Sequence, residues 1–295
     1  MNFLKDTSFK KLMRIFLVSD LHLERRKESI TEMDWSFLSG WPEAEICILA
    51  GDIGSPLLRR DLLQELFFRL VKKYRVYYLP GNHEYYNYDH QTSKKEIEEM
   101  LEKMCIETGV QWLFRKTIPV DQQGNPTLEG KEFVRLIGTT LWVHPSPESF
   151  SSNTDVQMGK IFTSNEEIQK LHLEEFKFLQ DELKKSLQAE KKVIVVTHHL
   201  PSYQMIHPRY QWFKGNDLFA SVTLETLRDD LKNVLIWMCG HTHERVVIDK
   251  FKGLLENCSL IAMTNPVGYQ REPRVTSFST DVVTLGSVPT TLPVK

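Results

Sequence analysis

The chain has 295 residues, 41% of them hydrophobic and 26% charged, and its formal net charge is −2. This composition is ordinary for a soluble protein that can bury a large core. The near-neutral charge gives no strong nucleic-acid signature, because a protein that binds long nucleic acids is expected to carry a strongly basic patch.

The sequence also gives no sign of a membrane protein. No apolar run approaches the ~20 residues that a membrane-spanning helix needs, and Lys5, Asp6 and Thr7 make the N-terminus polar rather than signal-like. The cysteines are widely spaced, which indicates reduced thiols rather than a disulfide framework. We therefore expect a cytoplasmic protein. The four cysteines are Cys47, Cys105, Cys239 and Cys258.

The first part of the chain alternates predicted strands and helices. Short apolar runs at residues 12–19, 46–50 and 76–79 are typical of buried strands. Between the last two runs, residues 57–74 carry apolar side chains at helical spacing, which predicts a crossover helix between parallel strands. Residues 97–109 predict a further amphipathic helix with a solvated acidic face.

The alternation continues in the second part of the chain. A segment rich in Ser, Pro and Asn at residues 139–165 predicts a long loop before a strongly charged helix at 166–187. Apolar runs at 193–197 and 234–239 predict two more strands, and residues 224–231 a short helix between them.

The C-terminal part carries three further apolar runs. They lie at residues 245–248, 254–263 and 275–285, and we expect successive antiparallel strands there. No linker divides the chain. Residues 1–295 are therefore expected to form one domain.

Five short motifs carry histidine and aspartate residues, and most of them follow a predicted strand. Because strand ends meet at one edge of a sheet, these side chains are expected to converge there. We expect two metal ions at that edge. The motifs are Ser19-Asp20-Leu21-His22, Gly51-Asp52, Gly81-Asn82-His83-Glu84, Thr197-His198-His199 and Gly240-His241-Thr242-His243.

The chemistry of these side chains favours divalent first-row metals. Carboxylate, imidazole and amide groups together suit Mn, Fe or Zn, whereas calcium would use oxygen ligands alone. About seven such side chains are too many for one tetrahedral zinc. Two ions that share one bridging carboxylate would use all of them, and such pairs are typical of hydrolytic phosphoryl-transfer enzymes.

In order and spacing, the five motifs resemble those of the calcineurin-like metallophosphoesterases. The resemblance covers residues 13 to 245, and it implies a four-layer α/β/β/α sandwich of two mixed sheets flanked by helices. It also implies that Asp52 bridges the two metals and that His83 acts as general acid or transition-state stabiliser without binding metal. The implied ligands are Asp20, His22 and His243 for the first metal, and Asn82, His198 and His241 for the second.

Some of these residues have structural alternatives. Asp20 and Asp52 could cap turns, and Asn82 follows a glycine, where turns are common. The complete motif set favours the ligand interpretation for all three. His198 and His199 face opposite ways on an extended backbone, so only His198 is expected to bind metal, while His199 would support the site or line the pocket.

The substrate rim is expected in two loop insertions, at residues 139–165 and 201–217. Basic and aromatic side chains beside an active site can bind phosphate and cover a leaving group. The second loop could instead be a solvated loop held down by its aromatic residues. Glu84 or a backbone carbonyl could orient His83. The candidate rim residues are His199, Tyr85, Arg209, Tyr210 and Trp212.

The predicted function is a metal-dependent phosphoesterase that hydrolyses a phosphomonoester or phosphodiester through a metal-bridging hydroxide. Asp52 and His83 are its predicted catalytic residues. A nucleotide or nucleic-acid phosphodiesterase or nuclease with the same site is an alternative. A non-catalytic scaffold is less favoured, because no expected ligand is missing. The expected partner is a phosphoester substrate; the sequence leaves the substrate, the native metal pair and the oligomeric state open.

Overall fold

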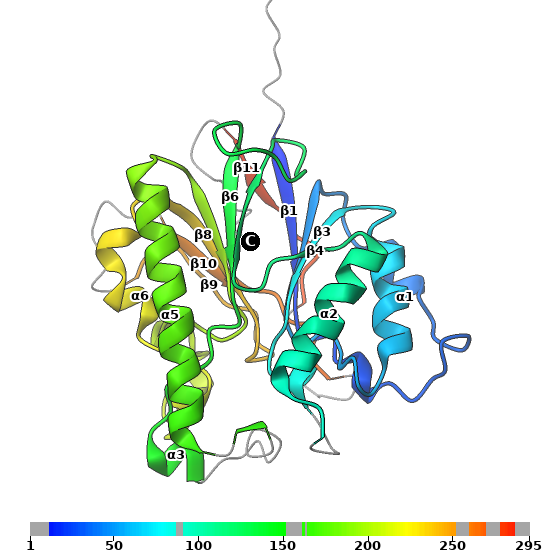
Figure 1. The fold of residues 1–295 in the computed structure, drawn as a ribbon, viewed down its shortest axis with the longest axis horizontal. Coiled ribbons are helices and arrows are strands. Elements are labelled where there is room, and N and C mark those ends of the chain that lie inside the picture. The colour runs from blue at the N-terminus through cyan, green and yellow to red at the C-terminus, as the bar shows by residue number, and fades with distance from the viewer. Residues whose placement is uncertain are drawn as a thin grey trace, which may run out of the picture.

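Two mixed β-sheets face one another, and helices cover their outer surfaces (Figure 1). The computed structural model describes residues 12–86, 91–151, 161–162, 164–251, 260–269 and 278–286. This arrangement confirms the predicted layers of helix, sheet, sheet and helix. Within the described part of the chain, no helix is long and apolar enough to cross a membrane.

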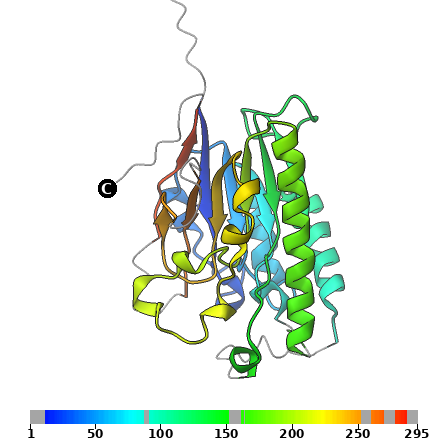
Figure 2. The same cartoon turned by 90° about the vertical axis from the view of Figure 1, so that its left-hand side faces the viewer.

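The first sheet has five strands in the order β11-β1-β2-β3-β4. Its central strands are parallel and almost wholly buried, as expected for a parallel sheet that is covered on both faces. β11 runs antiparallel to β1 at the outer edge, where Figure 2 shows the two strands together in red and dark blue. The strands are β1 (Met13–Val18), β2 (Ile46–Ala50), β3 (Arg75–Leu79), β4 (Gln111–Trp112) and β11 (Val283–Leu285).

Two helices cover the outer face of this sheet. Helix α1 (Arg60–Leu70) buries one apolar side and is shorter than the predicted helix. Helix α2 (Lys94–Thr108) begins at a capping box between Ser93 and Glu96 and ends at Gly109, whose φ of 82° suits glycine. These local signals fix both ends of α2 without help from distant contacts.

The second sheet has six strands in the order β5-β6-β7-β8-β10-β9. In β7, Ile194 and Val196 join the core between the sheets, whereas Val193 and Val195 join the core beneath helix α5 (Asn165–Gln188). The strands are β5 (Lys116–Val120), β6 (Val134–Gly138), β7 (Val193–Val196), β8 (Val234–Cys239), β9 (Val247–Ile248) and β10 (Ile261–Thr264).

Short helical elements occupy the predicted loops. The first loop contains α3 (Pro147–Ser151), and its residues 152–160 and 163 lie outside the described residues. The predicted helix at 224–231 is divided into α6 (Thr223–Thr226) and a 3₁₀ turn. The 3₁₀ turns are Leu23–Arg25, Ser36–Gly40, His83–Tyr85, Tyr203–Met205, Pro208–Tyr210, Asn216–Leu218 and Arg228–Asp230.

The C-terminal strands differ from the prediction of successive antiparallel pairs. Among the described residues of these runs, only β9 and β10 pair in that way, since β10 lies parallel to β8 and β11 belongs to the other sheet. Residues 254–259 and 275–277 of the predicted strands lie outside the described residues. Short apolar runs indicate strands but do not select their partners, which depend on contacts with distant strands. Cys47, Cys105 and Cys239 are buried free thiols, and Cys258 lies outside the described residues.

Candidate active site

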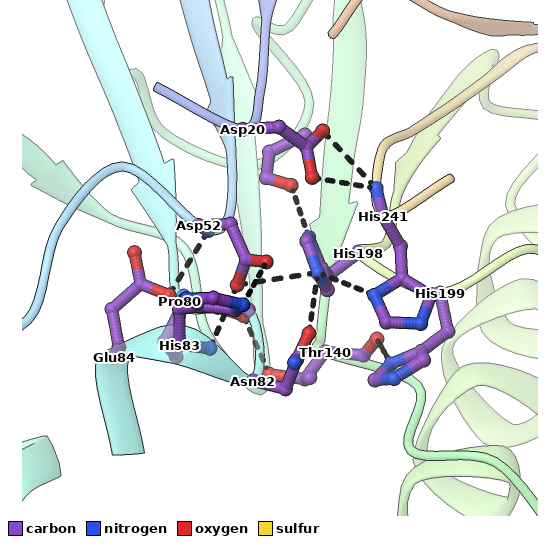
Figure 3. A network of polar contacts seen from close by, with 12 residues as sticks. Asp20, Asp52, Pro80, Asn82, His83, Glu84, Thr140, His198, His199 and His241 are labelled. Carbon is purple, nitrogen blue, oxygen red and sulfur yellow. Dashed lines mark hydrogen bonds and ion pairs between the residues drawn. The ribbon is translucent and has the colours of Figure 1, made fainter. Parts of the chain in front are cut away.

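The ends of five strands from both sheets bring the motif residues together (Figure 3). In the first sheet, Asp20, Asp52 and Asn82 follow β1, β2 and β3. In the second sheet, His198 and His241 follow β7 and β8. All five lie at the carboxyl ends of parallel strands, the edge where α/β sheets bind ligands.

The first cluster consists of Asp20, His22 and His243, whose ligand-type atoms all lie within 4.8 Å of one another. Nε2 of His22 lies 2.8 Å from Nε2 of His243, and the latter atom lies 3.5 Å from Oδ1 of Asp20. Two imidazole lone pairs at this distance repel each other unless a proton or a cation lies between them. The donor set therefore fits a divalent metal.

The second cluster consists of Asp52, His198 and His241, with the same limit of 4.8 Å. Nε2 of His198 lies 3.3 Å from Oδ1 of Asp52 and 3.2 Å from Nδ1 of His241. Nδ1 of His198 lies 2.9 Å from the carbonyl oxygen of Ala50, so this nitrogen donates and Nε2 keeps its lone pair for the cluster. A buried site with this geometry also fits a divalent metal.

Asn82 adds an amide oxygen to the second cluster. Its Oδ1 lies 2.9 Å from Nε2 of His198. Its Nδ2 donates to the hydroxyl of Tyr86 at 2.7 Å, and this hydrogen bond directs the oxygen towards the cluster. The structure thus places Asn82 where a neutral oxygen ligand would lie.

Asp52 faces both clusters. Its Oδ1 lies 3.3 Å from Nε2 of His198, and its Oδ2 lies 4.0 Å from Nε2 of His22. Oδ1 also accepts a hydrogen bond from the backbone N–H of His83 at 2.8 Å. One carboxylate thus presents one oxygen to each cluster, as a bridging ligand would.

The backbone is strained at five of these residues. Their φ values lie between 50° and 74°, in the left-handed region that residues other than glycine seldom adopt. The five residues are Asp20, His22, Asp52, His241 and His243. Such strain concentrates at functional sites, where the surrounding structure holds it in place. Here the sharp turn after each strand directs the side chain into the site.

Glycines allow the loops to approach the clusters closely. A Cβ on Gly81 would lie 2.2 Å from Oδ1 of Asp52, and one on Gly51 would lie 2.5 Å from Nδ1 of His198. Gly51 also has a φ of 83°. Only glycine fits these two positions, which explains why glycine precedes the ligand-type residue in both motifs.

The comparisons with known proteins agree with this geometry. The family model described as calcineurin-like phosphoesterase matches residues 13–245. The chain belongs to this family. The match ends two residues after His243, the last residue of the fifth motif, so it includes all five motifs.

The sequence is also similar to the uncharacterized protein L509 of Acanthamoeba polyphaga mimivirus. It is 28% identical over 287 residues, which cover 88% of this chain and 93% of that protein. The phosphopantetheinyl hydrolase of Mycobacterium tuberculosis has a similar crystal structure, with a TM-score of 0.63, 18% identity and coverage of 97% of this chain and 98% of that one. At 18% identity, the similarity to this crystal structure shows a shared fold and nothing more. A dimetal phosphatase from Danio rerio has a TM-score of 0.49 and 13% identity, with 93% and 95% coverage.

His83 lies over the clusters, and Glu24 orients it. Nδ1 of His83 lies 2.8 Å from Oε1 of Glu24, which is also 3.2 Å from Nδ1 of His22. Burial opposes ionisation of Glu24, but hydrogen bonds from His22 and His83 outweigh it and lower the pKa of Glu24 to about 2. Glu24 was not among the predicted residues, although it continues the alternation of Asp20 and His22.

Glu84 does not orient His83, contrary to one expectation. Its carboxylate accepts hydrogen bonds from the backbone N–H groups of Asp52 at 2.9 Å, Ile53 at 2.8 Å and Gly81 at 2.8 Å. Burial and the nearby carboxylate of Asp52 raise the pKa of Glu84 to about 7. Glu84 therefore holds together the two loops that carry Asp52 and Asn82.

A cavity of about 470 Å³ opens over the clusters, and only one of the five predicted rim residues lines it. Tyr210 does so. Arg209 forms an ion pair with Glu244 instead, and Trp212 projects outward with 92% of its surface exposed. The loop at residues 201–217 thus borders the cavity, but it turns only some of its side chains inward.

The other two predicted rim residues are buried and do not line the cavity. Tyr85 is in the core and donates from its hydroxyl to Glu98 at 3.0 Å. His199 is fully buried between Trp142 and His241, with ring centroids 5.4 and 4.3 Å away. Adjacency to a motif places these residues near the site, but the turn of the backbone directs their side chains away from the cavity.

Several cavity residues carried no recognisable sequence signal. Arg25 follows the first motif and Tyr269 lies near the end of the chain, yet both line the cavity. The backbone explains Tyr269, because the N–H groups of Val267 and Gly268 donate to Ser19 and Asp20 at 3.0 and 2.8 Å. This long-range pairing brings a distant segment over the first cluster. Phe213, Asn216 and Phe219 complete the wall on the side of the second loop.

Proposed function

We propose that this protein hydrolyses a phosphomonoester or phosphodiester and that it requires two divalent metal ions. Asp20, His22 and His243 would hold the first ion, and Asn82, His198 and His241 the second, with Asp52 shared between them. The position of Asp52 carries the proposal, because its two oxygens face different clusters. A shared carboxylate of this kind is typical of dinuclear hydrolytic sites.

The donor set favours Mn, Fe or Zn, since it combines imidazoles with carboxylate and amide oxygens. When bound, two such ions supply the positive charge that binds phosphoryl oxygens and lowers the pKa of a nucleophilic water. A phosphoester is anionic, so this charge offsets its repulsion of the nucleophile.

The role of His83 follows from its hydrogen bonds. Glu24 accepts at Nδ1, which leaves Nε2 directed to the cavity, 3.3 Å from the hydroxyl of Tyr269 and 3.9 Å from Oδ2 of Asp52. A ring held in this way can donate a proton from Nε2 to the leaving oxygen or stabilise charge on the phosphoryl group. It is therefore proposed as a catalytic residue and not as a metal ligand.

The buried thiols support the expected cytoplasmic location as part of the same proposal. Cys47, Cys105 and Cys239 are unpaired, and free cysteines are kept reduced in the cytosol. The cavity volume of about 470 Å³ likewise supports a small phosphoester as substrate in preference to a long nucleic acid.

The decisive experiment measures metal content and hydrolysis together. Protein purified without chelator and loaded with Mn²⁺ should contain two ions per chain by elemental analysis, and it should hydrolyse nitrophenyl phosphate or bis(nitrophenyl) phosphate. Removal of the metal by a chelator should abolish turnover, and Mn²⁺ should restore it. A metal-loaded protein that hydrolyses neither ester, or a stoichiometry near zero, would contradict the proposal.

A further inference from the structure

The cavity has two chemically different arms, one beside each metal cluster. The first, here called the Arg25 arm, consists of Arg25 and Tyr269. The ring of Tyr269 lies 4.4 Å from that of His22 and 4.5 Å from that of His243. The guanidinium carbon of Arg25 lies 4.2 Å from the centre of the Tyr269 ring. This cation–π contact fixes the charge beside the first cluster.

Arg25 has its charge available for a ligand. In the parts of the chain that the structure describes, no carboxylate lies within ion-pair distance of Arg25, whereas Arg209, which does not line the cavity, is paired with Glu244. Guanidinium groups bind phosphate oxygens with two parallel hydrogen bonds. The Arg25 arm is therefore suited to an anionic group of the substrate, next to the phosphoryl group that the clusters would hold.

The second arm, here called the aromatic arm, consists of Phe213, Phe219 and Asn216. The ring of Phe219 lies 5.1 Å from that of His241, and the ring of Phe213 lies 6.3 Å from that of Phe219. All three residues line the cavity. This arm thus lies beside the second cluster, whereas the Arg25 arm lies beside the first, and it offers aromatic surface to a flat group.

Asn216 makes this arm more suitable for a nucleobase than for an aliphatic chain. Its Nδ2 donates to the carbonyl oxygens of Tyr210 and Gln211 at 2.8 and 3.4 Å. Among the described residues nothing donates to its Oδ1, which remains an acceptor. An aliphatic group would cover this oxygen without pairing it, at a cost, whereas the amino group of a base would donate to it.

We propose, on the basis of the function proposed above, that the substrate is a nucleoside diphosphate, free or esterified on its second phosphate. The first phosphate lies at the two clusters, the base stacks in the aromatic arm, and the second phosphate binds Arg25. The first phosphorus of such a substrate carries the nucleoside on one side and the second phosphate on the other, and each arm would take one of these two groups. The volume of about 470 Å³ is in the range of small-molecule sites.

The reaction is a hydrolysis at the first phosphorus. The oxygen of water forms a bond to that phosphorus, and the bond from phosphorus to the bridging oxygen breaks. The bridging oxygen keeps the electron pair and leaves with the second phosphate, while the water proton is released. The products are a nucleoside monophosphate and phosphate, or a phosphate monoester when the second phosphate is esterified.

The position of attack can be tested with adenosine diphosphate and the Mn²⁺-loaded protein in water enriched in heavy oxygen. Attack at the first phosphorus places the label in adenosine monophosphate, as we expect. Label in the released phosphate would overturn the proposal. If no ester is hydrolysed, including nitrophenyl phosphate, the proposed function itself fails; if nitrophenyl esters are hydrolysed but adenosine diphosphate is not, only this inference fails.

Two variants with neighbouring controls test the arms. Arg25→Ala should lower kcat/KM for adenosine diphosphate relative to adenosine 5′-(methyl phosphate) by about tenfold to a hundredfold, while Lys27→Ala, outside the cavity, should leave this ratio unchanged. Phe213→Ala should lower kcat/KM for adenosine diphosphate relative to kcat/KM for methyl diphosphate by about tenfold. Its control is Trp212→Ala, because Trp212 projects into solvent.

Binding provides a measure that does not depend on turnover. Calorimetry with α,β-methylene adenosine diphosphate should give a Kd that rises by about tenfold or more in Arg25→Ala and in Phe213→Ala, and not in the controls. Equal Kd values in Arg25→Ala and the wild type would show that the second phosphate does not bind in the Arg25 arm. Equal Kd values in Phe213→Ala and the wild type would show that the base does not bind in the aromatic arm. An aliphatic diphosphate that binds as tightly as the nucleotide would show that this arm binds an aliphatic chain instead.

Discussion

Oε1 of Glu24 lies 2.8 Å from Nδ1 of His83 and 3.2 Å from Nδ1 of His22. A single buried carboxylate thus positions both a candidate metal ligand and the ring that stands over the clusters. Because each imidazole uses Nδ1 for this contact, each directs Nε2 to the site. The orientation of both rings depends on one side chain that belongs to neither of the two clusters described above.

Replacement of His83 separates catalysis from metal binding. His83→Ala should retain both metal ions but lower turnover by about 10²–10⁴, as expected for loss of a general acid or charge stabiliser. Elemental analysis and kinetics with a good and a poor leaving group provide the measurement. A smaller deficit with the good leaving group indicates proton donation, and equal deficits indicate electrostatic stabilisation. Loss of metal would make His83 a ligand.

The contribution of Glu24 can be isolated by a double-mutant cycle. Glu24→Gln keeps the size of the side chain but removes its charge, so we expect turnover to fall by about 10–10². In His83→Ala the same substitution should have a much smaller effect, because residues that act together are not additive. Fully additive losses in kcat would show that Glu24 does not act through His83.

Asp52→Asn should be the most damaging conservative change at the metal clusters. It weakens the oxygen that faces one of the two ions, so turnover on an aryl phosphate ester should fall by several orders of magnitude, and at least one ion should be lost. The matched control is Asp229→Asn, whose side chain is 77% exposed. Near-wild-type turnover in Asp52→Asn would disprove the bridging role.

Glu84 is expected to be a stability residue as well as a site residue. Glu84→Ala leaves the buried N–H groups of Asp52, Ile53 and Gly81 without their acceptor. The free energy of unfolding in urea should fall by about 2–4 kcal/mol, and metal retention should weaken. Glu99→Ala, on the exposed face of α2, should change neither. Unaltered stability in Glu84→Ala would mean that water replaces the carboxylate.

The layers of the fold and the convergence of the motifs could be predicted because they depend on local sequence. Asp20, Asp52 and Asn82 each follow a strand by only a few residues, so the strand end determines where the side chain lies. The helix predicted at residues 97–109 begins three residues too late, although the capping box at Ser93 and Glu96 marks the start of α2 locally. The family resemblance supplied the expected pairing of the two sheets.

The cavity wall could not be predicted, because it depends on the direction of individual side chains and on distant pairing. Trp212 and Phe213 are neighbours, yet one projects into solvent and the other lines the cavity. Tyr269 reaches the site only because its segment pairs with Ser19 and Asp20. Neither fact leaves a periodic pattern in the sequence.

The place of β11 beside β1 has a consequence for biosynthesis. Residues 283–285 complete the sheet next to β1, so this pairing has to await translation of the intervening residues. Until then, Met13 and Ile15 lie along an open strand edge, which is a template for association with other chains. A chain truncated before Val283 should therefore form aggregates during refolding that the full-length protein avoids.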